Sequence, residues 1–149
     1  MNGLMDERER VFGTRLQNIA YLDRPGAYAV ILGSDKKLAF VRGKAGRLFL
    51  PGGGVEPSER PKDALVREVI EEIGWRIRIL SRIGRATQFV CVEGEGCFAI
   101  RASYFRAVLI NRHTMKCEHE IVWLPVAAAA ACLARESDAW AISQLCDSR

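Results

Sequence analysis

Residues 53–75 read GGVEPSERPKDALVREVIEEIGW, and this stretch carries the strongest structural signal in the chain. Four apolar residues recur within it at spacings of three and four: Val66, Val69, Ile70 and Ile73. This period predicts an amphipathic α-helix over residues 61–73. Pro61 suits the first position of that helix, and Gly74 suits the left-handed residue just past its end.

The opposite face of the predicted helix is acidic. Glu68, Glu71 and Glu72 stand at positions i, i+3 and i+4 and therefore share one patch. Like charges at this spacing weaken a helix by roughly 0.2–0.5 kcal/mol for each pair. A divalent cation would reverse that repulsion, and carboxylate oxygens are the ligands that Mg2+ and Mn2+ take. The patch predicts a metal site; the alternative is a solvated acidic face, which is the usual meaning of charges on a helix.

A glycine-rich loop, Leu50-Pro51-Gly52-Gly53-Gly54, precedes the helix. Its glycines permit backbone torsions closed to other residues and let the main chain approach a ligand closely. Metal ions beside such a loop suit phosphoryl chemistry, because they neutralise phosphate charge and lower the pKa of a bound water. No serine or cysteine is placed with a histidine to act as a nucleophile, so direct attack by water is the simpler hypothesis.

The stretch also fits the pattern G-x5-E-x7-R-E-U-x-E-E-x-G-U, where U is a bulky apolar residue. All nine specified positions between Gly53 and Trp75 are occupied, seven of them by the specified residue itself. In this respect the chain resembles the Nudix hydrolases. The resemblance implies an α/β/α sandwich with a mixed sheet, and metal-dependent hydrolysis of a nucleoside diphosphate linked to another group.

The resemblance also implies roles for individual residues. Glu68, Glu71 and Glu72 resemble the family's metal ligands, and one of them is also implicated in activating water. Gly52 matches a position whose carbonyl contacts metal. Arg67, grouped with the catalytic residues, is expected to orient the neighbouring carboxylates. The structural members of the motif are Gly53, Glu59 and Gly74.

Further candidates lie outside the motif. The family often recruits one more carboxylate, and Glu118 and Glu120 are the candidates here; the alternative for each is a simply exposed side chain. Arg42 is favoured for contacts with substrate phosphates, with Lys44 and Arg47 as weaker candidates.

Three positions depart from the usual pattern, although none removes a ligand: Ser58, Arg60 and Trp75. Arg60 stands where a capping Ser or Thr is expected before the helix. Its side chain cannot accept the capping hydrogen bond, at a cost of about 1 kcal/mol of helix stability.

Strand and helix signals surround the motif. An apolar hairpin is predicted at residues 27–32 and 37–42, followed by short strands at 48–50 and 75–79 and longer ones at 86–92 and 97–110. A strand at 120–124, an alanine-rich helix at 126–133 and a last helix through Leu145, capped by Ser137 or Asp138, complete the prediction. This order describes an α/β or α+β sandwich.

Length and composition fit one domain over residues 1–149, with the first twenty residues weakly structured. The chain has 149 residues, 49% of them apolar, and no run approaching the roughly 20 residues of a membrane span. The N-terminus lacks an apolar signal core, so the expected location is the cytoplasm. The net charge of +4 suits a small polyanionic molecule and falls short of a nucleic-acid footprint. The oligomeric state stays open between monomer and homodimer.

Five cysteines, none in a C-x-x-C pair, indicate neither a disulfide framework nor a zinc site. Most of them are expected to be small core residues. Cys91 and Cys97 flank a predicted turn at 93–96 and are candidates to face each other across it. His113 and His119 are expected on the surface.

The markers of three Nudix subfamilies are absent after the motif: those of the ADP-ribose, diadenosine polyphosphate and NADH enzymes. The remaining expectation is a MutT-like enzyme acting on a nucleoside triphosphate, with 8-oxo-dGTP as a candidate. Two alternatives remain, an inactive nucleotide-sensing module and an enzyme that trims the triphosphate end of RNA.

Overall fold

The computed structural model describes residues 9–147, and the side chains of residues 9–145. Within this range one mixed sheet runs in the order β1-β6-β7-β2-β3-β4, with β5 paired to β2 and β8 paired to β3. β1 pairs with β6 and β2 with β7 in parallel, and the other pairings are antiparallel. The strands are β1 (Arg10–Phe12), β2 (Leu22–Leu32), β3 (Lys37–Arg42), β4 (Leu48–Phe49), β5 (Gly52–Gly54), β6 (Trp75–Val92), β7 (Gly96–Arg112) and β8 (Val122–Pro125).

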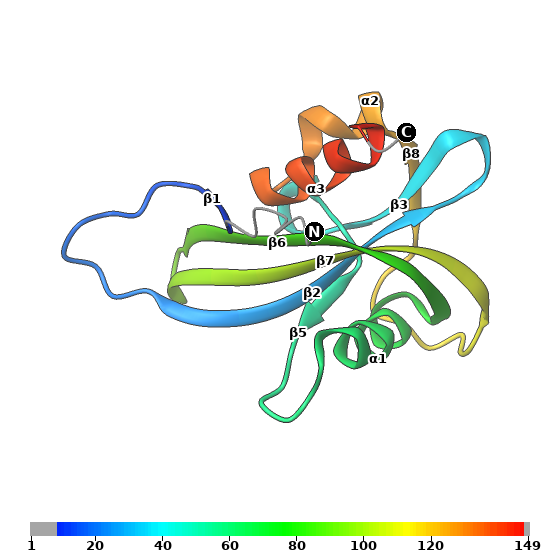
Figure 1. The fold of residues 1–149 in the computed structure, drawn as a ribbon, viewed down its shortest axis with the longest axis horizontal. Coiled ribbons are helices and arrows are strands. Elements are labelled where there is room, and N and C mark those ends of the chain that lie inside the picture. The colour runs from blue at the N-terminus through cyan, green and yellow to red at the C-terminus, as the bar shows by residue number, and fades with distance from the viewer. Residues whose placement is uncertain (1–8, 148–149) are drawn as a thin grey trace, which may run out of the picture.

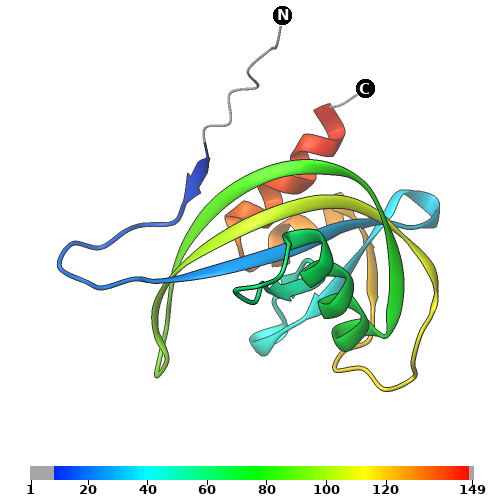
Figure 2. The same cartoon turned by 60° about the horizontal axis from the view of Figure 1, so that its bottom comes forward.

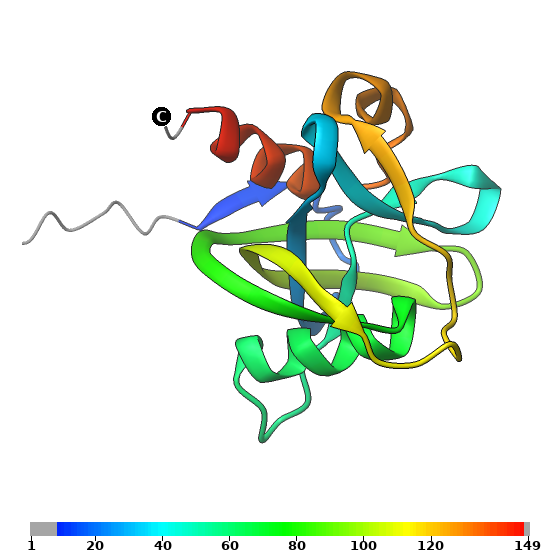
Figure 3. The same ribbon diagram turned by 90° about the vertical axis from the view of Figure 1, so that its right-hand side faces the viewer.

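The helices lie on both faces of the sheet. α1 (Pro61–Ile73) covers one face, and α2 (Val126–Ala129) and α3 (Glu136–Asp147) cover the other (Figure 1; Figure 3). Buried residues form one apolar cluster on each side: Leu65, Val69 and Ile73 belong to the α1 cluster, and Tyr104 and Ile142 belong to the α3 cluster. This arrangement confirms the predicted α/β/α sandwich with a mixed sheet. No helix among the described residues is long and apolar enough to cross a membrane.

The β6–β7 hairpin is the longest element, and it curves around the molecule (Figure 2). Two separate strands were predicted at 75–79 and 86–92, but β6 runs through both. The register shifts between Arg76 and Ile77, Ile79 and Ser81, and Arg82 and Gly84, so alternation is broken where the strand bends. Those irregularities concealed the continuous strand.

The N-terminal segment is more ordered than predicted where the structure describes it. Arg10–Phe12 form β1 and pair with Ala86–Gln88 of β6, whereas residues 1–8 lie outside the described range. Strand pairing is made by main-chain groups, so a short strand within a mostly polar segment gives little signal in the sequence.

The C-terminal helices differ from the prediction. The alanine-rich stretch forms only the four-residue α2 and a 3-10 turn at Ala130–Cys132. Ser137 and Asp138 do not cap α3, because that helix already begins at Glu136 and both residues are fully buried. The Tyr104 hydroxyl lies 2.7 Å from Ser137 Oγ and from Asp138 Oδ1, and the Leu50 amide donates to Asp138 Oδ2 over 3.3 Å. These polar side chains make hydrogen bonds inside the core and do not cap the helix.

The cysteines also correct the prediction. Cys91 and Cys97 do face each other across the hairpin, and they form a disulfide that was not expected. Cys91 and Cys132 are exposed and Cys97 and Cys117 are half-buried, so these four are not core residues; the side chain of Cys146 lies outside the described range. Their positions in a hairpin tip and in loops explain the difference.

Candidate active site

The acidic helix α1 forms as predicted. Pro61 occupies its first turn, Arg60 makes no side-chain capping bond, and Gly74 ends it with φ of 77°. Leu65, Val69 and Ile73 are buried against the sheet, which turns Glu68, Glu71 and Glu72 away from the core. The apolar stripe thus fixes the direction of the acidic face.

The glycine loop is pressed between β2 and α1. Gly52 has φ of 141°, and a Cβ there would lie 2.1 Å from the Ala27 carbonyl oxygen. A Cβ on Gly53 would lie 2.4 Å from Glu68 Oε2. The amide of Gly52 donates to Glu72 Oε1 over 3.1 Å. Gly52 therefore has to be a glycine, because its closest neighbours are main-chain atoms and its φ is positive, whereas at Gly53 the close neighbour is the end of a flexible side chain.

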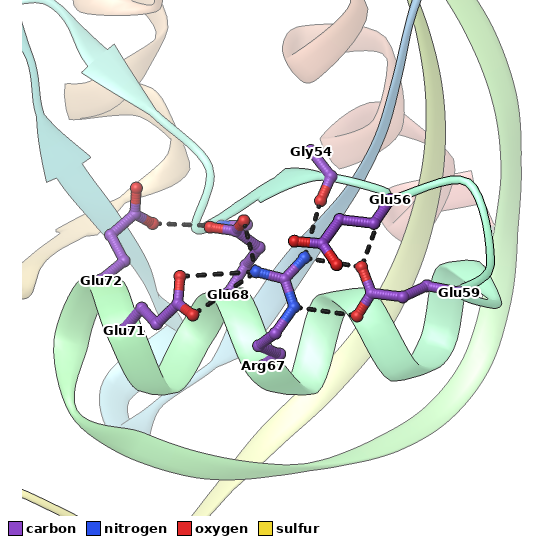
Figure 4. Close-up of polar contacts among 8 residues, drawn as sticks. Gly54, Glu56, Glu59, Arg67, Glu68, Glu71 and Glu72 are labelled. Atoms are coloured by element: carbon purple, nitrogen blue, oxygen red, sulfur yellow. Dashed lines mark hydrogen bonds and ion pairs between the residues drawn. The ribbon is translucent and has the colours of Figure 1, made fainter.

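Arg67 organises the acidic patch (Figure 4). Its guanidinium donates twice to Glu59, at 2.7 and 2.8 Å, and once to Glu68 Oε1 at 2.9 Å. Longer contacts reach Glu71 at 3.4 Å and the Gly54 carbonyl at 3.1 Å. The two-point bond from Arg67 lowers the pKa of Glu59 to about 2, which keeps that carboxylate charged. The geometry brings Arg67 and Glu59 together, a pairing that the sequence did not predict.

Two of the helix glutamates hold a proton more tightly than usual. Burial raises the pKa of Glu72 to about 7, against the opposing effect of the Gly52 amide, and the charges of Glu68 and Glu118 raise it further. Burial is also the main cause that raises the pKa of Glu68. Glu71 is more open, with half of its side chain exposed. The patch thus contains negative charge that the protein compensates only in part.

The donor set suits a hard divalent cation. Oxygen ligands dominate the patch, and Mg2+ typically takes one or two carboxylates and completes its shell with water and substrate phosphates. Among the described residues, no three acidic, histidine or cysteine side chains are grouped so that they could hold an ion by themselves. Arg67 and the Gly52 amide hold the carboxylates instead, so Glu68, Glu71 and Glu72 would hold a cation together with ligand oxygens.

The loop before β8 brings one outside carboxylate to the patch. The amide of Glu118 donates to the Glu71 carbonyl at 3.3 Å, and that of His119 donates to the Glu72 carbonyl at 2.8 Å. These bonds satisfy carbonyls at the end of α1. Both candidate carboxylates are exposed, and Glu118 is the one whose charge raises the pKa of Glu68 and Glu72.

A pocket of about 250 Å³ opens beside Glu72. Arg42 lines it, whereas Lys44 and Arg47 do not, and Arg47 donates to the Leu133 carbonyl. His119, expected on the surface, is half-buried and lines the pocket as well. His113 is exposed, as expected.

Sequence reasoning missed one prominent pocket residue. Arg135, directly before α3, also lines the cavity and lies 5.1 Å from the ring centre of Tyr28 and 5.0 Å from that of Phe49. No local pattern around position 135 signals this placement, because the packing of α3 on the sheet creates it.

Comparison with known proteins agrees with this geometry. A model of the NUDIX domain matches residues 22–145. The chain belongs to the Nudix family. Its Nudix helix is α1, with the glycine loop and Arg67 network around it.

Two curated Nudix relatives match the chain over part of its length. One, "Putative 8-oxo-dGTP diphosphatase" from Bacillus subtilis, is 37% identical over 60 residues, which are 40% of each chain. The other, "Nucleoside triphosphatase NudI" from Escherichia fergusonii, is 42% identical over 62 residues, 42% of this chain and 40% of that protein. The chain spans about two fifths of the length of the curated relatives it matches.

Solved Nudix structures share the fold. A Nudix hydrolase from Nitrosomonas europaea superposes with a TM-score of 0.68 at 22% identity, covering 83% of this chain and 88% of that one. At this identity the likeness concerns the fold alone.

Proposed function

We propose that this protein is a metal-dependent pyrophosphohydrolase that cleaves the diphosphate linkage of a nucleoside diphosphate derivative. The observation that supports this most directly is the acidic patch of Glu68, Glu71 and Glu72, joined through Glu72 to a pocket that is open to ligand. Three carboxylates beside a glycine loop are the donors that a cation shared with phosphates requires.

The substrate class we propose is a nucleoside triphosphate, hydrolysed to the monophosphate and pyrophosphate. The names of the two curated relatives support this class, and one of them names 8-oxo-dGTP. The cofactor we propose is Mg2+, with Mn2+ as a substitute. Two alternatives are a nucleotide sensor without activity and an enzyme that acts on RNA 5′ ends. The hydrolysis panel described below distinguishes both from a nucleoside triphosphate hydrolase.

We assign a separate role to each residue of the site. A bound divalent cation would supply phosphate neutralisation and an activated water. Glu72 and Glu71, with Glu68 one turn earlier, would hold it, and one of the three accepts the proton of the attacking water. Arg67 positions Glu68 and Glu71 through its hydrogen bonds. Arg42, an exposed residue that lines the pocket, would contact the phosphate chain.

The test is a hydrolysis panel at fixed Mg2+. Unmodified and oxidised nucleoside triphosphates, ADP-ribose, dinucleoside polyphosphates and capped and triphosphorylated RNA are compared, with and without EDTA. Glu72→Gln is expected to remove activity, whereas Glu95→Gln makes the same chemical change at the exposed β6–β7 turn and is expected to keep it. Absence of activity on every compound, or full activity in Glu72→Gln, would refute the proposal. Hydrolysis in 18O-labelled water identifies the phosphorus that is attacked.

A further inference from the structure

The pocket beside Glu72 has a polar part, which includes Arg42 and Glu72, and an apolar part. Val41 and Leu50 are buried and apolar, and the rings of Tyr28 and Phe49 add flat aromatic surface. Such walls favour a planar, weakly hydrated group over an oxyanion that would lose its water. Arg42, which is exposed at the edge, is better placed for phosphates. The apolar part of the pocket therefore suits the base of a nucleotide.

Arg135 is the polar group set among these walls. Its guanidinium carbon lies over both rings, 5.1 Å from the ring centre of Tyr28 and 5.0 Å from that of Phe49. A guanidinium has five N–H donors arranged around its edge and accepts no hydrogen bond. Contact with the rings uses no N–H donor, so these donors stay available to a ligand in the pocket.

The surroundings of Arg135 hold it in place. Asp138, fully buried, interacts electrostatically with it, as does Tyr28. The Asp138 oxygens accept hydrogen bonds from the Leu50 amide and the Tyr104 hydroxyl, and among the described residues Arg135 donates none to Asp138. Of the five N–H donors of Arg135, the Tyr28 hydroxyl can accept at most two, so the others remain for a ligand.

We infer that Arg135 selects the base, and that the base it selects is guanine. Two neighbouring N–H groups require two neighbouring acceptors in one plane, and O6 and N7 of guanine meet this requirement. Adenine has an N6 amino group in place of O6. That group is a donor, so it cannot accept a hydrogen bond from the guanidinium. In 8-oxoguanine N7 carries a hydrogen, so only O6 remains as an acceptor. This assignment rests on the proposed function, and it ranks dGTP above 8-oxo-dGTP and both above dATP.

The kinetic test compares dGTP, dATP and 7-deaza-dGTP, which lacks the N7 acceptor. The wild-type enzyme is expected to prefer dGTP to dATP by about 10-fold or more in kcat/KM, and to lose several-fold on 7-deaza-dGTP. In Arg135→Met, which keeps an apolar stem against the rings, both differences are expected to vanish. Arg42→Gln is the matched control, because it should lower kcat/KM for all three nucleotides alike. Equal rates on dGTP and dATP, or an unchanged ratio in Arg135→Met, would overturn the inference.

Two additions keep the result decisive. Arg135→Lys retains the charge but not the planar donor edge, so it should lose the preference while circular dichroism and chemical unfolding confirm its fold. Calorimetric binding of dGMP and dAMP in EDTA needs neither metal nor turnover. A dGMP preference that depends on Arg135, without hydrolysis of any triphosphate, would sink the proposed function and keep the inference. Hydrolysis with no base preference would keep the proposed function and overturn the inference.

Discussion

Replacing Glu72 by Gln should stabilise the metal-free protein. The carboxyl of Glu72 has a pKa of about 7 instead of its ordinary 4.5, mainly because burial disfavours its charge. A rise of this size, at about 1.4 kcal/mol for each pH unit, corresponds to roughly 3 kcal/mol. Gln is neutral at every pH, similar in shape, and its amide oxygen can accept the same bond from Gly52.

The sign of the effect follows from the direction of the pKa change. A folded protein that binds the proton more tightly than the unfolded chain loses stability as pH rises. For wild type the loss begins near pH 4.5 and is complete above about pH 7. Glu72→Gln should therefore match wild type near pH 4.5 and exceed its free energy of unfolding by about 2–3 kcal/mol at pH 8.

Urea unfolding in EDTA at pH 4.5, 6 and 8 measures this difference. Addition of Mg2+ at pH 8 should then raise the stability of wild type but not that of Glu72→Gln. A variant that is less stable than wild type at pH 8 in EDTA would refute the reasoning, because it would mean that the buried charge does not oppose folding. Glu95→Gln, at the exposed hairpin turn, should differ from wild type by less than about 0.5 kcal/mol at each pH.

Three further predictions concern the same site. Gly52→Ala should lower the free energy of unfolding in urea by more than about 2 kcal/mol, because its Cβ would lie 2.1 Å from a β2 carbonyl oxygen at φ of 141°. Gly54→Ala, whose Cβ would have its nearest neighbour 3.9 Å away, should lower it by less than about 1 kcal/mol. Equal losses in the two variants would contradict this account. Arg67→Lys should lose the two-point bond to Glu59 and lower kcat about 10-fold or more with KM little changed, whereas an unchanged kcat would show that Arg67 does not position the carboxylates. The affinity for Mg2+, measured by calorimetry, should be weaker at pH 6 than at pH 8 because Glu72 must lose its proton to bind, and pH-independent affinity would exclude Glu72 as a ligand.

The local features of the fold and site could be predicted because short-range patterns encode them. Helix period, Pro61 and Gly74 fix α1, and three glycines before it predict the close loop. The acidic face then follows from geometry, since the apolar stripe determines which side chains point outward. The bond between Glu59 and Arg67 was not predicted, because eight residues and a loop separate them.

Short-range sequence patterns did not predict contacts that depend on the packing of helices or on the register of strands. Arg135 meets Tyr28 only through the packing of α3, and the Cys91–Cys97 disulfide depends on the register of a hairpin. The bends of β6 hid its continuity, because each register shift interrupts the alternation that identifies a strand. Ser137 resembled a cap by residue type alone, whereas burial decided its role.

The hydrogen bonds on either side of Pro51 make the segment before α1 a junction between the two outer layers of the sandwich. The amide of Leu50 is held by Asp138 from α3, and the amide of Gly52 is held by Glu72 from α1. Because proline has no amide proton, these are two consecutive exchangeable protons along the chain, each protected by a side chain from a different helix. Their hydrogen-exchange rates would report separately on the two layers: ligand at the acidic patch should alter protection at Gly52 first, and loosening of the last helix should alter it at Leu50.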